Sequence, residues 1–208
     1  MKLKYLKRIP VVAVLPLIFS GCADFGVLQP SEDTAVFYYL DSPMDTAQAE
    51  ALQSDGIAVL VGPTSIAKYL DQPQIATWSN PNQLTFSETQ RWAEPLEENI
   101  NRVLIDHLSM ELGSSQVGFL RVMSDIEWDY RVGYHIYQLI GTPGDKVHLQ
   151  ASWWVVSKDG ETRRFDGSVF EEPVAGDYGD YPAYVRAIES LIGKWSKEVS
   201  VKIQEMDN

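Results

Sequence analysis

Histidines are the first side chains of this sequence to test for acid–base or metal chemistry. The chain has three, His107, His135 and His148, and their spacing fits neither a zinc-ligand pattern nor a catalytic triad. The sequence also contains no Gly-x-Ser-x-Gly elbow and no Gly-rich phosphate loop, since residues 141–144 (Gly-Thr-Pro-Gly) are typical of a hairpin turn. We therefore predict no catalytic site and no cofactor, which argues against an enzyme.

Carboxylates gather in two clusters. One lies where a helix is expected to begin and the other where a loop is expected; their members are Glu94, Glu97 and Glu98, and Glu171, Glu172, Asp177 and Asp180. The first cluster suits the positive end of a helix dipole. The second shows no ordered ladder of Ca²⁺ ligands, so weak Ca²⁺ binding stays a minor alternative to a solvated acidic face. We expect no metal site.

The single cysteine, Cys22, lies in the segment that points most directly to a chemical modification. A basic start precedes an apolar run from Ile9 to Phe19, which is too short for a membrane span of about 20 residues. The segment Phe19-Ser20-Gly21-Cys22 resembles the bacterial lipobox, with Phe19 in place of the commoner leucine. We therefore expect a signal peptide over residues 1–21, cleavage before Cys22, and acylation of that cysteine with chains such as palmitate.

The expected anchor predicts the location of the protein. Two or three acyl chains hold a protein on a membrane essentially permanently, because each buried CH₂ contributes about 0.8 kcal/mol. Ala23 follows the cysteine where an aspartate would signal retention, which by resemblance to Gram-negative lipoprotein sorting indicates the periplasmic face of the outer membrane. Residues 22–34 have the composition of a flexible tether, and the domain follows over residues 35–208. Removing the signal peptide takes the formal charge from −12 to −16, which disfavours nucleic acid as a partner.

Hydrophobic periodicity divides residues 35–208 into strands and two long helices. The helices are expected from Pro95 to Leu112 and from about Asp180 to Ile203, where apolar residues recur at helical spacing. Strands are expected at residues 36–40, 57–61, 75–79, 83–87, 117–123, 128–138, 147–155 and 165–169, with a helical turn at 65–70. The first two strands are apolar enough to be central, and the last three alternate as an antiparallel meander. We expect a single α/β domain with a mixed β-sheet and the two main helices packed on it.

Three aromatic residues near expected loops, Tyr69, Trp78 and Trp92, belong either to the core or to a contact surface, and the sequence leaves this open. Two of them lie in motifs, Tyr69-Leu70-Asp71-Gln72-Pro73 and Arg91-Trp92-Ala93-Glu94-Pro95-Leu96. Together with Tyr38-Tyr39-Leu40 and Gly62-Pro63, these motifs resemble the ABC-type transport auxiliary lipoprotein family, whose best-known type is paraquat-inducible protein C. The resemblance covers about residues 36–199.

The resemblance implies a function in transport rather than catalysis. Family members are outer-membrane lipoproteins that face the periplasm and work with a mammalian-cell-entry (MCE) domain protein, which carries phospholipid between the membranes. In some systems an inner-membrane permease completes the path, and a ring-like homo-oligomer is implied as well. We accordingly expect Tyr69, Leu70, Asp71 and Trp92 to contact a partner or to shape the loop. A structural envelope lipoprotein that handles no lipid is the alternative, and an envelope hydrolase has no support in the sequence.

Overall fold

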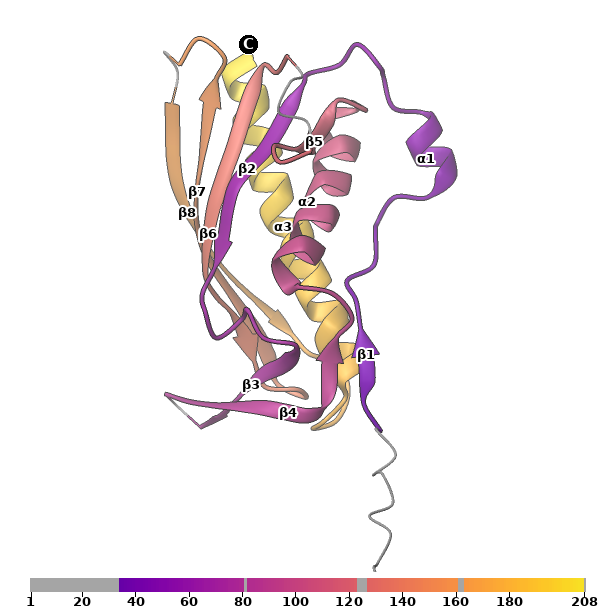
Figure 1. Cartoon of the computed structure of the whole chain (residues 1–208), viewed down its shortest axis with the longest axis vertical. Coiled ribbons are helices and arrows are strands. Elements are labelled where there is room, and N and C mark those ends of the chain that lie inside the picture. Colours follow the sequence, from indigo (N-terminus) through magenta and orange to yellow (C-terminus); the bar gives the residue numbers. More distant parts are fainter. Residues whose placement is uncertain (1–33, 81, 123–126, 161–162, 208) are drawn as a thin grey trace, which may run out of the picture. The chain divides into compact units, whose positions relative to one another are not determined.

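The computed structural model describes residues 34–80, 82–122, 127–160 and 163–207 (Figure 1). The expected signal peptide, Cys22 and the expected tether as far as Asp33 lie outside these residues. Among the described residues, no helix combines the length and the apolar character needed to cross a membrane.

The described residues form two β-sheets. The smaller has the order β1-β4-β3 and consists of β1 (Val36–Tyr38), β4 (Gln83–Trp92) and β3 (Gln74–Asn80). The larger has the order β5-β2-β6-β7-β8 and consists of β5 (Val117–Phe119), β2 (Val59–Ile66), β6 (Tyr130–Gly141), β7 (Lys146–Ser157) and β8 (Arg163–Pro173). Parallel pairs join β1 to β4 and β2 to both β5 and β6, whereas the β3–β4 hairpin and the β6–β7–β8 meander are antiparallel. The predicted mixed sheet and meander are thus confirmed.

Two long helices cover one face of the five-stranded sheet (Figure 1). These are α2 (Leu96–Leu112) and α3 (Tyr181–Asp207), and they also pack against each other. A short helix, α1 (Thr46–Glu50), lies in the connection between β1 and β2, and Asp45 and Gln48 close a capping box at its start. The spacing of those two residues is a local signal from which α1 could have been predicted. No helix in the described part of the chain covers the opposite face of the sheet (Figure 1).

Alternation along β6 gives the five-stranded sheet one buried face. Val132, Tyr134 and Ile136 are almost fully buried toward the helices, whereas Tyr137 on the open face is 48% exposed. The rings of Tyr134 and Trp195 in α3 meet edge to face, with their centroids 4.9 Å apart. Burying a large apolar side chain contributes roughly 1.5–3 kcal/mol, so contacts of this kind hold α3 on the sheet.

The first predicted strand lies at an edge rather than in the centre of a sheet. Within the described residues β1 pairs with β4 alone, and Val36 and Phe37 are 46% and 58% exposed. A run of apolar residues does not distinguish a central strand from an edge strand that carries a contact surface. The second predicted strand is central, as expected, because β2 lies between β5 and β6 with Val59, Leu60 and Val61 buried.

Two local predictions are wrong at the ends of elements. Strand β2 continues through Ile66, and a turn closed by the Leu70 N–H on the Ala67 carbonyl (2.8 Å) replaces the helical turn expected there. The strand expected over residues 117–123 ends at Phe119. Hydrogen bonds to distant segments decide such boundaries, and a single sequence does not contain them.

Candidate functional site

One histidine, His135, makes a polar contact that lacks the geometry of a catalytic triad. His135 in β6 lies beside Ser65 in β2, with 2.8 Å between Ser65 Oγ and His135 Nδ1, and its ring meets that of Tyr137 at 4.5 Å. No hydrogen bond or ion pair among the described residues joins His135 to the carboxylate that orients a triad histidine. The described residues also contain no group of three or more His, Cys, Asp or Glu placed to hold a metal ion. The Ser65–His135 pair is therefore a polar contact of the sheet surface.

The first acidic cluster lies at the start of α2, as predicted. Glu97 is in the first turn and accepts a hydrogen bond from the Thr64 hydroxyl at 2.6 Å, which links α2 to β2. Glu94 forms an ion pair with Arg102 at 3.1 Å, and both side chains are 40% exposed. An ion pair with that exposure contributes at most about 1 kcal/mol. These carboxylates support the local structure.

Half of the second acidic cluster lies in a strand rather than in the expected loop, because Glu171 and Glu172 belong to β8. Glu171 contacts Lys146 Nζ at 2.7 Å and His148 Nδ1 at 2.9 Å. The hydrogen bond from Lys146 holds the pKa of Glu171 below its ordinary value. Glu172 forms an ion pair with Lys194. Both carboxylates are thus engaged with cationic side chains of the domain, which favours a structural role.

The four predicted loop residues divide into two buried and two accessible side chains. Leu70 and Trp92 are 4% and 6% exposed and belong to the core. The Trp92 backbone N–H donates to the Pro73 carbonyl at 2.7 Å, so the loop is fastened to the end of β4. Tyr69 is half-buried and Asp71 is exposed. Leu70 and Trp92 therefore hold the loop in place, whereas the side chains of Tyr69 and Asp71 remain accessible to solvent.

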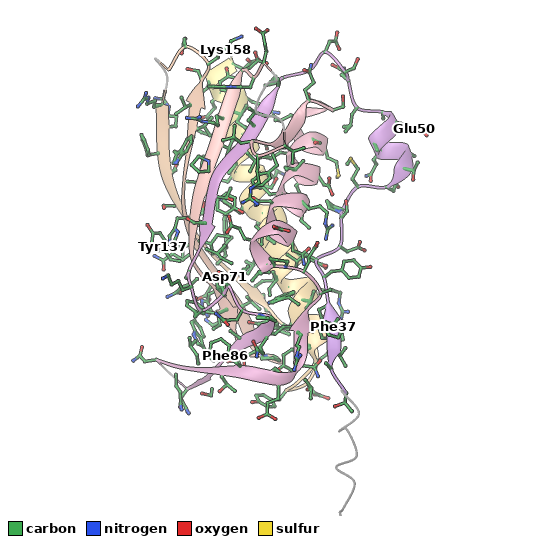
Figure 2. The ribbon with its side chains drawn as sticks, in the orientation of Figure 1. Phe37, Glu50, Asp71, Phe86, Tyr137 and Lys158 are labelled. Carbon is green, nitrogen blue, oxygen red and sulfur yellow. The ribbon has the colours of Figure 1, made fainter. Side chains whose placement is uncertain are left out.

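A hydrogen bond fixes Tyr69 against the five-stranded sheet. Its hydroxyl donates to the Tyr137 carbonyl in β6 at 3.1 Å. Burial raises the pKa of the Tyr69 phenol, so the hydroxyl stays protonated at neutral pH. Tyr137 lies at a β-bulge, where the pairing of β6 with β7 shifts between Ile136 and Gln138. Because Ile136 faces the helices, alternation along β6 places Tyr137 on the other side of the sheet, as Figure 2 shows, and the bulge interrupts that alternation for the residues that follow.

Several hollows border the loop of residues 69–73, and two of them, a larger and a smaller one, together include Tyr69, Asp71 and Trp92 in their linings. The larger has a volume of about 720 Å³, and its lining includes Tyr69, Tyr137 of β6 and Trp78 of the β3–β4 hairpin. The smaller has a volume of about 280 Å³, and its lining includes Asp71 and Trp92. Ligand pockets in proteins span roughly 300–1,000 Å³, so the larger hollow has the size of a binding site.

The neighbours of Trp78 in the larger hollow, Leu84, Tyr137 and Gln138, were not predicted. Leu84 could have been predicted from the sequence, because a hairpin across residues 80–82 pairs Trp78 with Leu84. Regular alternation along β6 already places Tyr137 on the open face, but Gln138 could not have been predicted beside it, because the bulge between Ile136 and Gln138 has no signature in the sequence of β6. The hollow thus joins segments about 60 residues apart in the chain through contacts that only the fold creates.

Comparison with known proteins identifies the family of the domain. The family model for the ABC-type transport auxiliary lipoprotein component matches residues 38–200. The chain belongs to that family. The match covers most of both sheets and of both long helices, and all of the loop of residues 69–73, so the family description applies to nearly all of the described domain of this auxiliary lipoprotein.

Solved structures share the fold of this auxiliary lipoprotein at low sequence identity. A crystal structure of an uncharacterized protein has a TM-score of 0.66 at 15% identity, with 81% of this chain and 98% of that chain covered. Protein XCC0632 from Xanthomonas campestris has a TM-score of 0.63 at 14% identity, with 84% of this chain and 100% of that chain covered. No curated protein sequence matches the chain significantly. These likenesses concern the arrangement of helices and strands.

Proposed function

We propose that this auxiliary lipoprotein docks an MCE-domain carrier protein at the outer membrane, in an ABC-type transport system of the paraquat-inducible protein C type. The observation that carries the proposal is the family match, which includes the accessible loop of residues 69–73. In the proposed system the carrier brings phospholipid across the periplasm, and an inner-membrane permease completes the path. The auxiliary lipoprotein itself would perform no chemical step.

Cys22 is the anchor in this proposal. Its acyl chains would hold the protein on the periplasmic face of the outer membrane, because each buried CH₂ contributes about 0.8 kcal/mol of membrane affinity. Residues 22–34 would act as a flexible tether, which spans about 20 Å. A domain restricted to that distance is well placed to receive the end of a carrier protein.

The proposed docking surface is the accessible part of the loop of residues 69–73. Tyr69 offers an aromatic ring fixed by its hydrogen bond to β6, and tyrosine is enriched where interfaces gain most of their binding energy. Asp71 offers an exposed carboxylate that would select a cationic group on the carrier. Leu70 and Trp92 lie beneath the loop and support its shape.

A homo-oligomeric ring is part of the same proposal. The edge strand β1 carries Phe37 at 58% exposure, and the edge strand β8 carries Phe165 at 73% and Val169 at 71%. Several exposed apolar side chains on an edge strand are typical of an interaction surface. Two such edges on different sheets favour head-to-tail contacts between copies, and these close a ring when the rotation between copies permits.

Charge reversal in the loop tests the docking step. Full-length lipoprotein with Asp71→Lys should capture the MCE-domain protein from its own membranes at least about tenfold less well than the wild type. Glu50→Lys is the matched control, since it changes the net charge equally on α1, well apart from Asp71 (Figure 2). Capture should remain unchanged in this control.

Tyr69→Ala extends the test to the aromatic part of the loop and should also weaken capture. Leu70→Ala is unsuitable as a test because Leu70 is in the core, where truncation costs about 2–5 kcal/mol of stability. If Asp71→Lys and Tyr69→Ala both captured the carrier as well as the wild type does, the loop would not be the docking surface.

A further inference from the structure

The larger hollow beside Tyr69 is uncharged, although 22% of the chain is charged and the net charge is −12. None of the ten described residues that line it is Asp, Glu, Lys, Arg or His. Five of them are aromatic or aliphatic, and the other five carry a hydroxyl or an amide group. A ligand that suits such a lining is itself uncharged, with both apolar and hydrogen-bonding surfaces.

Aromatic rings of the hollow are fixed by contacts within the domain. The Tyr69 hydroxyl donates to the Tyr137 carbonyl at 3.1 Å. The Trp78 ring packs on the ring of His148, with centroids 4.9 Å apart and planes inclined by 48°. The Trp78 carbonyl also accepts a hydrogen bond from the Thr142 hydroxyl at 3.4 Å. Because these rings are already ordered, little conformational entropy would be lost when a flat apolar group stacks on them.

The polar half of the lining offers hydrogen-bonding groups beside the rings. Gln138 lines the hollow, and its side-chain amide makes no hydrogen bond to another described residue, so its two donors and its acceptor are available to a ligand. Asn80 uses its Nδ2 to donate to Gln83 at 3.0 Å, which leaves its side-chain oxygen able to accept. An amide group beside an aromatic side chain can form hydrogen bonds to hydroxyl groups at the edge of a ligand ring that stacks on that side chain.

Three other ligand classes fit this lining less well. A phosphate head group would require a cationic side chain, and none lines the hollow among the described residues. An acyl chain would cover five hydroxyl or amide side chains without satisfying their hydrogen bonds. A peptide strand added to β3 would need free carbonyls along its edge. The Ala76 carbonyl, however, already accepts from the Tyr184 hydroxyl, and the Trp78 carbonyl is likewise engaged.

We infer that the hollow binds a neutral saccharide, either a free glycan or the head group of a glycolipid. The C–H faces of sugar rings would stack on Trp78, Tyr69 and Tyr137, and their hydroxyls would bond to Gln138 and Asn80. The volume of about 720 Å³ accommodates about two or three sugar rings. This activity is additional to docking of the carrier protein and does not depend on it.

Saturation-transfer NMR on the mature lipoprotein in phosphatidylcholine nanodiscs tests the inference. The probes are maltotriose and chitotriose as free neutral saccharides, octyl maltoside below its micelle concentration as a glycolipid analogue, and monomeric dihexanoylphosphatidylcholine as a phosphate-bearing lipid. We expect transfer to the sugar protons of at least one trisaccharide or of octyl maltoside. Binding of a trisaccharide indicates a glycan, whereas binding of octyl maltoside alone through its sugar protons indicates a glycolipid.

Trp78→Ala should weaken saccharide binding at least about tenfold. The matched control is Trp128→Ala, which removes the same ring just before the other end of β6 and should leave binding within about twofold. Tyr137→Ala, at a side chain that is 48% exposed, provides a second variant in case Trp78→Ala fails to fold. Capture of the carrier protein by Trp78→Ala should remain normal, which separates this test from that of the docking loop.

The inference would be overturned by any of three results. The first is no transfer to the sugar protons of any probe at 10 mM, on the order of the weakest affinities expected for such sites. The second is binding of dihexanoylphosphatidylcholine without any saccharide, which would make the hollow a lipid site. The third is loss of carrier capture in Trp78→Ala without saccharide binding by the wild type, which would make it a protein-docking site.

Discussion

Replacing Tyr184 by phenylalanine should destabilise the domain at the junction of its two sheets. The Tyr184 hydroxyl in α3 accepts a hydrogen bond from Gly141 N at the end of β6 (3.0 Å) and donates to the Ala76 carbonyl in β3 (3.2 Å). Tyr184 is 1% exposed, and Gly141 and Ala76 are buried as well. Tyr184→Phe removes only the oxygen, so the N–H of Gly141 and the carbonyl of Ala76 remain buried without this partner.

The loss of stability in Tyr184→Phe comes from the Gly141 N–H and the Ala76 carbonyl. A buried polar group left unsatisfied costs about 1–3 kcal/mol, and partial relaxation of β3 would reduce the sum, so we expect a loss of about 2–4 kcal/mol. For a domain of this size that corresponds to a fall in Tm of about 5–12 °C. Burial raises the pKa of Tyr184, so the hydroxyl stays neutral and the loss should be the same from pH 6 to pH 9.

Urea unfolding followed by tryptophan fluorescence measures this loss, and amide hydrogen exchange should become faster in β3. Tyr178→Phe is the matched control, because Tyr178 is 84% exposed and its free energy of unfolding should change by less than about 0.5 kcal/mol. If Tyr184→Phe lowered the free energy of unfolding by less than about 1 kcal/mol, the hydroxyl would not join the two sheets as described.

Three further predictions concern packing, pH and the anchor. Gly133→Ala should lower the free energy of unfolding by about 1–3 kcal/mol in urea titrations and change the near-UV circular dichroism, because its Cβ would overlap the Trp154 ring; unchanged spectra and stability would contradict this contact. Burial lowers the pKa of His107, so the unfolded chain takes up a proton near pH 6.5 before the folded chain does, and stability should fall as pH drops below about 6.5. His107→Gln should make the free energy of unfolding depend less on pH below about 6.5. An unchanged pH dependence would exclude His107 as its source. Cys22→Ser should abolish labelling by radioactive palmitate, and continued labelling would place the acyl chains elsewhere.

Periodic elements were predictable because their signals are local. The stripe from Leu96 to Leu108 identified α2, and Gly113, with a φ of 64°, ends it in the left-handed conformation that favours glycine. Alternation from Tyr130 to Ile136 likewise identified β6 and its buried face. These patterns depend only on which residues recur at 3.6 or 2 positions.

The division into two sheets was not predictable from such signals. The run from Val36 to Leu40 has the apolar character of a central strand, but β1 forms an edge of its sheet among the described residues, and Phe37 on it is exposed. Among the proposed docking residues, Tyr69 and Asp71 were predicted from the motif around Pro73. The larger hollow was not, because the β-bulge at Tyr137 and the packing of Trp78 on His148 depend on long-range register.

Extraction of the full-length lipoprotein from its own membranes in mild detergent, followed by mass spectrometry of the proteins and lipids that accompany it, tests the docking function most directly. The proposal predicts an MCE-domain protein with bound phospholipid in the wild-type and Glu50→Lys samples, and its loss from the Asp71→Lys sample. A wild-type lipoprotein that came alone, or only with unrelated envelope proteins, would contradict the transport function and leave a structural lipoprotein of the envelope in its place.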